Sequence, residues 1–209
     1  MGAADLELFA QSNVEALLIP KINAATDLDR VGDLATDKRL WAMIETPAGV
    51  LNASEIAAHP ALDGFVLGTN DLAKDLNCRS AMDRLPLLTS LQLTLLAAKQ
   101  NKVVCIDGVY NAFKDDEGLR RECIQGCDFG MDGKSLIHPA QVAIANEIFA
   151  PSTEDIELAR RQIAAFEDAI AEGKGVAVLD GRIVENLHVE TARATLAKAK
   201  AISELEGTP

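Results

Sequence analysis

The chain has 209 residues, enough for one domain with a sizeable core and a small appendage. Its formal net charge of -12 argues against nucleic acid as a partner, because phosphate backbones are bound by clustered Lys and Arg. Aromatic residues make up only 4%, so Leu, Ile, Val and Ala must build the core.

Short apolar runs recur along the chain, each followed by a stretch with helical spacing. A predicted helix at residues 6–9 opens the chain, and the clearest later helix covers residues 85–100, with Leu88, Leu91, Leu95 and Leu96 on one face. Continuous apolar runs are typical of strands buried on both faces of a parallel sheet, and their alternation with helices indicates βαβ units. The predicted strands cover residues 16–19, 41–44, 64–67, 103–106 and 127–131.

The C-terminal part has a different pattern, typical of an arm or lid. We therefore predict two parts, with residues 1–150 forming the β/α sheet and residues 151–209 forming the arm. The elements predicted for the arm are a helix from the cap Ser152 to Gly173, a β-hairpin around Asp180-Gly181, and a helix over residues 189–205.

No segment resembles an export signal or a membrane span. The first residues include Asp5 and Glu7 and lack a basic start followed by an apolar run, and no apolar stretch reaches the roughly 20 residues of a spanning helix. The four cysteines form no CxxC pair. We expect reduced thiols, no zinc, no membrane partner and a cytoplasmic location.

Acidic residues follow two consecutive predicted strands. Glu45 comes directly after residues 41–44, and Asp71 follows residues 64–67 through Gly68-Thr69-Asn70. The carboxyl ends of parallel strands carry the working residues, and neighbouring strands lie ~4.8 Å apart, so the two carboxylates can converge on one ion. Oxygen ligands without His or Cys favour Mg²⁺, or Mn²⁺ in its place. From the residues alone, ordinary helix-terminal carboxylates are an equally good interpretation.

Other strand ends carry charged residues with two open interpretations. Lys21 follows the first strand and is either an anion-binding cation or a surface lysine with a buried stem. Asp107 and Asp132 follow later strands and either line the pocket or cap turns.

Four motifs occur in a specific order: MIETPAG around Glu45, LGTNDL around Asp71, DGKSLIHPAQ at residues 132–141 and NEIF at residues 146–149. Together they resemble the citrate lyase β subunit family of the HpcH/HpaI aldolase superfamily, and its malyl-CoA and citramalyl-CoA lyase members in particular. The resemblance implies a (β/α)8 TIM barrel, here incomplete at the N-terminus, and a homo-oligomer, either a trimer or a hexamer.

The resemblance also implies a reaction and a set of site residues. The reaction is reversible carbon–carbon cleavage of a 3-hydroxyacyl-CoA thioester, such as malyl-CoA or citramalyl-CoA, into an acyl-CoA and a 2-oxo acid. Glu45 and Asp71 would hold Mg²⁺, Asn70 would position the substrate carboxylate, and Ile137 and His138 would line the coenzyme A site. For His138, a structural role before a helix-starting proline stays open.

The arm departs from the family at one position. Glu185 stands where the family places an Asp that enters a neighbouring subunit's site, so it is either a catalytic proton-transfer group or an exposed hairpin carboxylate. Three alternatives to the lyase remain: a class II pyruvate-type aldolase acting on free acids, a malyl-CoA thioesterase, and a non-catalytic subunit or inactive fragment.

Overall fold

The computed structural model describes residues 8–9, 11–33, 38–79 and 83–207. The chain forms two compact units, Met1–Phe149 and Ala150–Pro209, which are described separately below. Of the helix predicted at residues 6–9, residues 8 and 9 are helical, whereas residues 6 and 7 lie outside the described part.

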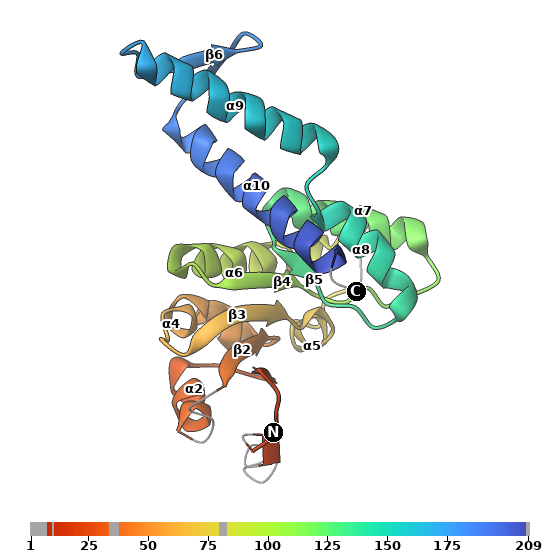
Figure 1. Cartoon of the computed structure of the whole chain (residues 1–209). Coiled ribbons are helices and arrows are strands. Elements are labelled where there is room, and N and C mark those ends of the chain that lie inside the picture. The colour runs from red at the N-terminus through yellow and green to blue at the C-terminus, as the bar shows by residue number, and fades with distance from the viewer. Residues whose placement is uncertain (1–7, 10, 34–37, 80–82, 208–209) are drawn as a thin grey trace. The chain divides into compact units, whose positions relative to one another are not determined.

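The first unit is built on a parallel sheet whose strands follow one another in chain order (Figure 1). The register pairs Ile19 with Ala42, and Ile44 with Leu67. The carboxyl ends of these strands therefore lie along one edge of the sheet, which places the residues that follow them side by side. The strands are β1 Ala16–Ile19, β2 Arg39–Ile44, β3 Leu62–Leu67, β4 Val104–Asp107 and β5 Gly133–Lys134.

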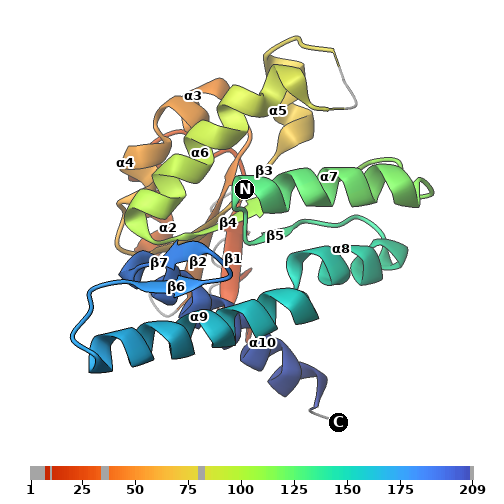
Figure 2. The same cartoon turned by 90° about the horizontal axis from the view of Figure 1, so that it is seen from above.

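Helices connect these strands, as the alternating pattern predicts. Figures 1 and 2 show them packed around the sheet, with α6 against α4 and β4, and α7 against α8. Phe65, Leu40 and Leu91 are fully buried in a core that is mostly aliphatic. The helices are α2 Ala25–Gly32, α3 Pro47–Leu51, α4 Ala53–Ala57, α5 Thr69–Asp75, η1 Leu85–Leu87, α6 Leu88–Asn101, α7 Asp116–Phe129, η2 Pro139–Gln141 and α8 Val142–Phe149.

The fold class is confirmed as α/β with a parallel sheet. Within the described residues the five strands form an open sheet, in which β1 and β5 are the edges. Two details of the prediction are wrong. Residues 127–129 continue helix α7, which Gly130 ends in the left-handed conformation at φ 96°, so the fifth strand begins only at Gly133. Leu96 is 66% exposed, off the buried face of α6.

The second unit is a helical hairpin that carries a small antiparallel pair of strands. Ser152 caps α9, with its Oγ accepting a hydrogen bond from the Asp155 N–H at 3.0 Å. Asp180 and Gly181, at φ 50° and 75°, make the tight turn of the strand pair. None of the described helices is long and apolar enough to cross a membrane. The elements are α9 Thr153–Ala171, β6 Ala177–Leu179, β7 Arg182–Val184 and α10 Asn186–Glu206.

Candidate active site

Lys21 joins the two carboxylates that follow β2 and β3. Its backbone N–H donates to Glu45 Oε1 at 2.8 Å, and its ammonium group lies 2.8 Å from Asp71 Oδ1. Lys21 follows β1 in the left-handed conformation, at φ 56°, which turns its N–H and its side chain toward the neighbouring strand ends. The structure therefore gathers Lys21, Glu45 and Asp71 at the carboxyl edge of the sheet.

Glu45 is held tightly at this edge. Its side chain is buried, with only 4% of the residue exposed. A Cβ atom on Gly68 would lie 2.3 Å from Glu45 Cβ and 2.7 Å from its Oε2, so the turn after β3 needs glycine to leave room for this carboxylate. Thr46, the next residue, caps α3 by accepting a hydrogen bond from the Gly49 N–H at 3.0 Å.

The ion pair with Lys21 keeps Asp71 charged. The hydrogen bond from the Lys21 ammonium group, together with its positive charge, lowers the pKa of Asp71 below its ordinary value. The same contact raises the pKa of Lys21. Both side chains are substantially exposed, at 59% and 44%, so solvent screens the pair and a competing cation can replace the ammonium group at little cost.

The donor set at this edge fits a hard divalent cation. Among the described residues, no cluster of three or more His, Cys, Asp or Glu side chains could hold a metal ion. Magnesium commonly takes one or two protein carboxylates and leaves the remaining positions to water and substrate. The Lys21 ammonium group already marks a position where positive charge is stabilised beside Asp71. Glu45 and Asp71 therefore suit Mg²⁺ better than zinc.

Asn70 forms a reciprocal pair with an asparagine from the loop after β4. Its Nδ2 donates to Asn111 Oδ1 at 3.1 Å, and Asn111 Nδ2 donates back to Asn70 Oδ1 at 2.6 Å. Both residues are exposed. The pair ties the start of α5 to the β4 loop, which sets the position of Asn70 beside Asp71.

The segment after β5 places Ile137 and His138 on the surface. Ile137 is 51% exposed. The His138 ring stacks on Phe113 with 4.7 Å between ring centroids, and its Nδ1 accepts a hydrogen bond from the Ala140 N–H at 3.1 Å. His138 therefore caps η2, which is the structural role that the sequence left open. The residue is also exposed, so its ring is accessible to a ligand.

Glu185 belongs to the second unit. It is exposed and precedes α10, where its N–H donates to His188 Nδ1 at 3.0 Å. Its role in a site with Glu45 and Asp71 therefore stays a prediction.

Asp107, the last residue of β4, and Asp132, directly before β5, have different surroundings. Asp132 accepts a hydrogen bond from the Cys105 N–H of β4 at 2.9 Å and pairs with Lys99 of α6 at 2.7 Å, so it joins neighbouring elements and does not line the cavity described below. Asp107 is fully buried, and two cations neutralise it: Arg84 Nη1 at 2.7 Å and Lys134 Nζ at 3.0 Å.

A second acid completes this buried cluster. Glu122 of α7 lies 2.6 Å from Lys134 Nζ and 3.7 Å from Arg84 Nη1. Two positive and two negative groups therefore balance one another below the edge of the sheet. Sequence reasoning missed Arg84, Glu122 and Asn111, because a basic residue before a Leu-Pro turn or an acid within a helix carries no distinguishing pattern.

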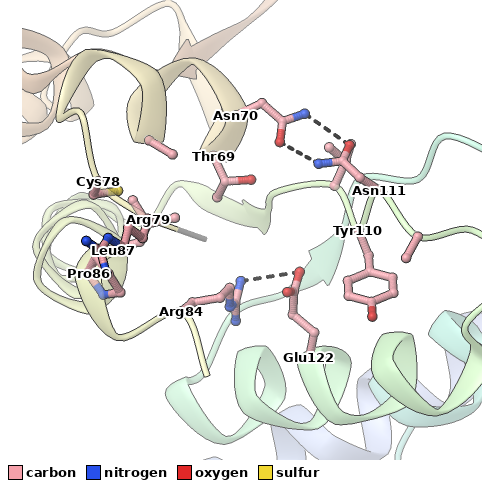
Figure 3. A pocket seen from close by; sticks show the side chains of 13 residues that line it. Thr69, Asn70, Cys78, Arg79, Arg84, Pro86, Leu87, Tyr110, Asn111 and Glu122 are labelled. Carbon is pink, nitrogen blue, oxygen red and sulfur yellow. Dashed lines mark hydrogen bonds and ion pairs between the residues drawn. The ribbon is translucent and has the colours of Figure 1, made fainter. Parts of the chain in front are cut away.

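A cavity of about 270 Å³ lies beside α5 and contacts this cluster. Figure 3 shows Arg84 and Glu122 facing each other on one side of the cavity and the Asn70–Asn111 pair on the other. Thr69, Arg79 and Tyr110 also line it. The hydrogen bond from Tyr110 to Asp115, together with burial, raises the pKa of Tyr110 to about 12, so this phenol stays protonated at neutral pH.

Known proteins resemble the chain along most of its length. A family model described as HpcH/HpaI aldolase/citrate lyase matches residues 1–139. The (3S)-malyl-CoA thioesterase of Cereibacter sphaeroides is 61% identical over 97% of this chain and 71% of its own length. The citrate lyase subunit beta of Escherichia coli is 31% identical over 95% of this chain and 70% of its own length.

A solved structure agrees with these relatives. The crystal structure of CitE from Mycobacterium tuberculosis, in complex with magnesium, acetoacetate and coenzyme A, matches with a TM-score of 0.81 at 28% identity. The match covers 95% of this chain and 73% of that one.

The predicted carbon–carbon cleavage is wrong in the light of these relatives. The 61% identical protein is named a thioesterase, which hydrolyses a thioester, whereas the citrate lyase subunit is only 31% identical. The sequence could not separate the two reactions, because a pair of carboxylates that holds a metal ion favours a chelating substrate in both. It does not specify whether the thioester is hydrolysed by water or the carbon–carbon bond is cleaved. The family itself is established by the match to residues 1–139 and by the 61% identity along nearly the whole chain: this protein belongs to the HpcH/HpaI aldolase/citrate lyase family.

Proposed function

We propose that this chain hydrolyses a 3-hydroxyacyl-CoA thioester of the malyl-CoA type, with Mg²⁺ held by Glu45 and Asp71. One observation carries the choice of reaction: the relative that is 61% identical over 97% of the chain is a (3S)-malyl-CoA thioesterase. The CitE structure, which contains magnesium, acetoacetate and coenzyme A, supports a metal ion and a coenzyme A group as ligands of this chain.

The residues of the site fit this reaction. The hydrogen bond and charge of Lys21 lower the pKa of Asp71, and the Lys21 N–H fixes Glu45. Mg²⁺ bound there would act as a Lewis acid toward oxygen atoms of the substrate. Lys21, when its ammonium group leaves Asp71, can pair with a substrate carboxylate. Asn70 can donate a hydrogen bond to the same ligand from the start of α5.

Hydrolysis needs a water molecule and a group that accepts its proton. The water oxygen bonds to the thioester carbonyl carbon, the carbon–sulfur bond breaks, and coenzyme A leaves as a thiol after gaining a proton, which releases a free carboxylic acid. We assign proton transfer from the water to Glu185, supplied by the arm of a neighbouring copy. His138 and Ile137 would contact coenzyme A through their exposed surfaces.

The test separates thioester hydrolysis from carbon–carbon cleavage. The full chain is incubated with (3S)-malyl-CoA and Mg²⁺, and free thiol and glyoxylate are measured in parallel. We expect thiol release without glyoxylate, and no release after chelation of the metal. Glyoxylate in amounts equal to the consumed thioester, or thiol release that does not need a metal, would overturn the proposal.

Variants test the metal ligands. Glu45→Gln and Asp71→Asn should each abolish turnover and weaken Mg²⁺ binding measured by calorimetry. Asp75→Asn, at the exposed end of the same helix as Asp71, is the matched control and should keep both properties. Wild-type Mg²⁺ affinity in either ligand variant would contradict the assignment.

A further inference from the structure

Gln141 is a buried amide at the end of the segment that carries Ile137 and His138. Only 1% of the residue is exposed. Its Oε1 accepts hydrogen bonds from the Ile137 N–H at 3.0 Å and the His138 N–H at 3.3 Å, and its Nε2 donates to the Tyr110 carbonyl oxygen at 2.9 Å. A buried amide is costly unless both of its ends find partners. These contacts therefore fix the side chain in one orientation, with its nitrogen toward Tyr110.

The residues that Gln141 contacts follow two neighbouring strands. Tyr110 belongs to the loop after β4, whereas Ile137 and His138 follow β5, which pairs with β4 in the sheet. The loop after β4 contacts His138 a second time, because the ring of Phe113 stacks on the His138 ring with 4.7 Å between centroids. The position of Ile137 and His138 is therefore set by the loop after β4 as well as by their own strand.

The loop after β4 is also tied to the helix that carries Asp71. Asn111 of this loop exchanges two hydrogen bonds with Asn70, which precedes Asp71 in the first turn of α5 (Figure 3). The start of α5, the loop after β4 and the backbone of His138 are thus connected in series, and Gln141 makes the last connection. This series joins a proposed metal ligand to the proposed contact surface for coenzyme A.

Helix capping explains only part of what Gln141 does. Gln141 is the third residue of η2, and its oxygen completes a capping box with His138. A capping side chain at this position needs only an oxygen, so glutamate serves as well as glutamine. The Nε2 hydrogen bond to Tyr110, 31 residues away in the sequence, adds nothing to the start of η2. The nitrogen of Gln141 therefore has a role that the cap does not account for.

We propose that Gln141 is a positioning residue, which holds the backbone of Ile137 and His138 where their side chains contact the coenzyme A group of the substrate. This inference rests on the proposed function, because that contact is part of it. Gln141 is buried, and within the described chain its hydrogen bonds reach neither Glu45 nor Asp71. Its loss should therefore weaken binding of the coenzyme A group without changing the chemical step.

The variant Gln141→Glu separates the Tyr110 contact from the cap. Its carboxylate keeps an oxygen for the Ile137 and His138 N–H groups, which favour the ionised form, but it cannot donate to the Tyr110 carbonyl oxygen. Steady-state kinetics of the full chain are measured with (3S)-malyl-CoA and with the malyl thioester of N-acetylcysteamine, which lacks most of coenzyme A. We expect the KM for malyl-CoA to rise about tenfold, roughly the effect of one lost buried hydrogen bond, with kcat unchanged. Both constants for the short thioester should stay as in the wild type.

Two further variants provide the comparison. Gln141→Met removes the cap and the Tyr110 contact together without adding a charge, so it should raise the KM for malyl-CoA at least as much. It also decides the question if Gln141→Glu does not fold, which thermal unfolding checks for each variant. Gln100→Glu introduces the same charge at an exposed position of α6 and should change neither constant.

Direct binding makes the test independent of turnover. Coenzyme A is titrated by calorimetry into the wild type and each variant, and the dissociation constants should change by the same factors as KM. If the chain hydrolyses no thioester but both Gln141 variants bind coenzyme A about tenfold more weakly, the proposed function fails and the positioning role stands. Wild-type KM and coenzyme A affinity in Gln141→Glu would assign Gln141 to the cap alone and overturn the proposal. An equal rise of KM for the short thioester, or no coenzyme A binding by the wild type, would overturn it as well.

Discussion

Individual side chains in this protein differ sharply in how easily they can ionise. Burial raises the pKa of the Cys105 thiol to about 12 and that of Cys123 to about 11, whereas Cys127 is exposed on α7. Since the thiolate is the reactive form, the two buried cysteines are inert at neutral pH, as expected for reduced core residues.

Thiol labelling checks this difference. In the native protein we expect Cys127 to react fastest with an aromatic disulfide reagent, and Cys105 and Cys123 to react only after unfolding. A Cys127→Ser variant should lose the fast phase.

The two buried thiols also make the stability of the fold depend on pH. In the unfolded chain a thiol has a pKa of about 8.5, whereas burial raises the pKa values of Cys105 and Cys123 to about 12 and about 11. The contribution of the two protonated thiols to the free energy of unfolding is therefore complete below pH ~8.5 and is lost as the pH rises toward the folded pKa values. Urea unfolding measured across this range should show the decline, and fast native labelling of Cys105 would contradict the burial.

Among the connecting elements, the turn from β3 into α5 leaves no room for a side chain at Gly68. Gly68→Ala would bring a Cβ within 2.3 Å of Glu45 Cβ, and neither atom can rotate away. We expect a loss of stability of about 1–3 kcal/mol together with weaker Mg²⁺ binding. Gly175→Ala, where a Cβ would meet nothing within 4 Å, is the control for both measurements. Unchanged Mg²⁺ affinity in Gly68→Ala would mean that Glu45 does not bind the metal.

Strands β4 and β5 depend on the buried charge cluster. The side chain of Lys134 is fully buried and donates to Asp107, Glu122 and the Gly108 carbonyl oxygen. Lys134→Met would leave two acids with Arg84 alone, and we expect a cost of about 3–5 kcal/mol in urea unfolding. The exposed pair of Lys174 and Glu172 gives the comparison, since Lys174→Met should cost less than about 1 kcal/mol. Equal effects of the two variants would refute the cluster's structural role.

Sequence patterns predicted four strands well and the fifth poorly. The runs at 16–19, 41–44, 64–67 and 103–106 are apolar throughout, and this composition is what made the strands predictable. Only β3 is buried along nearly its whole length, whereas β1 and β4 alternate buried residues with exposed or partly exposed ones. Strand β5 is two residues long, Gly133–Lys134, and has no apolar signal of its own. The position of Glu45 and Asp71 at one edge of the sheet was predictable, because each follows a recognisable strand, and their role as metal ligands stays a prediction. Arg84, by contrast, reaches Asp107 only through tertiary packing between segments far apart in the sequence.

For the molecule as a whole, the second unit exposes apolar side chains that suggest an assembly. Val178, Ile183 and Leu187 are 69%, 61% and 58% exposed. We expect light scattering after gel filtration to give a mass that is a multiple of the 22.3 kDa chain. The double variant Val178→Ser/Ile183→Ser should lower this mass, whereas Leu51→Ser, at a site 79% exposed in the first unit, should not. A wild-type monomer would exclude the homo-oligomer and, with it, the supply of Glu185 by a neighbouring copy.

The contact between Lys21 and Asp71 also bears on how the protein responds to scarce metal. Because the lysine provides an internal counter-ion, the carboxylate is not left uncompensated when the metal is removed. We expect protein stripped of metal by a chelator to stay folded and to melt in one cooperative transition, and saturating Mg²⁺ to raise its melting temperature as any native-state ligand does. Unfolding on chelation, as in a zinc finger, would contradict this. The supply of magnesium in a cell would then set what fraction of the enzyme works, while the metal-free molecules stay folded and ready to bind the ion.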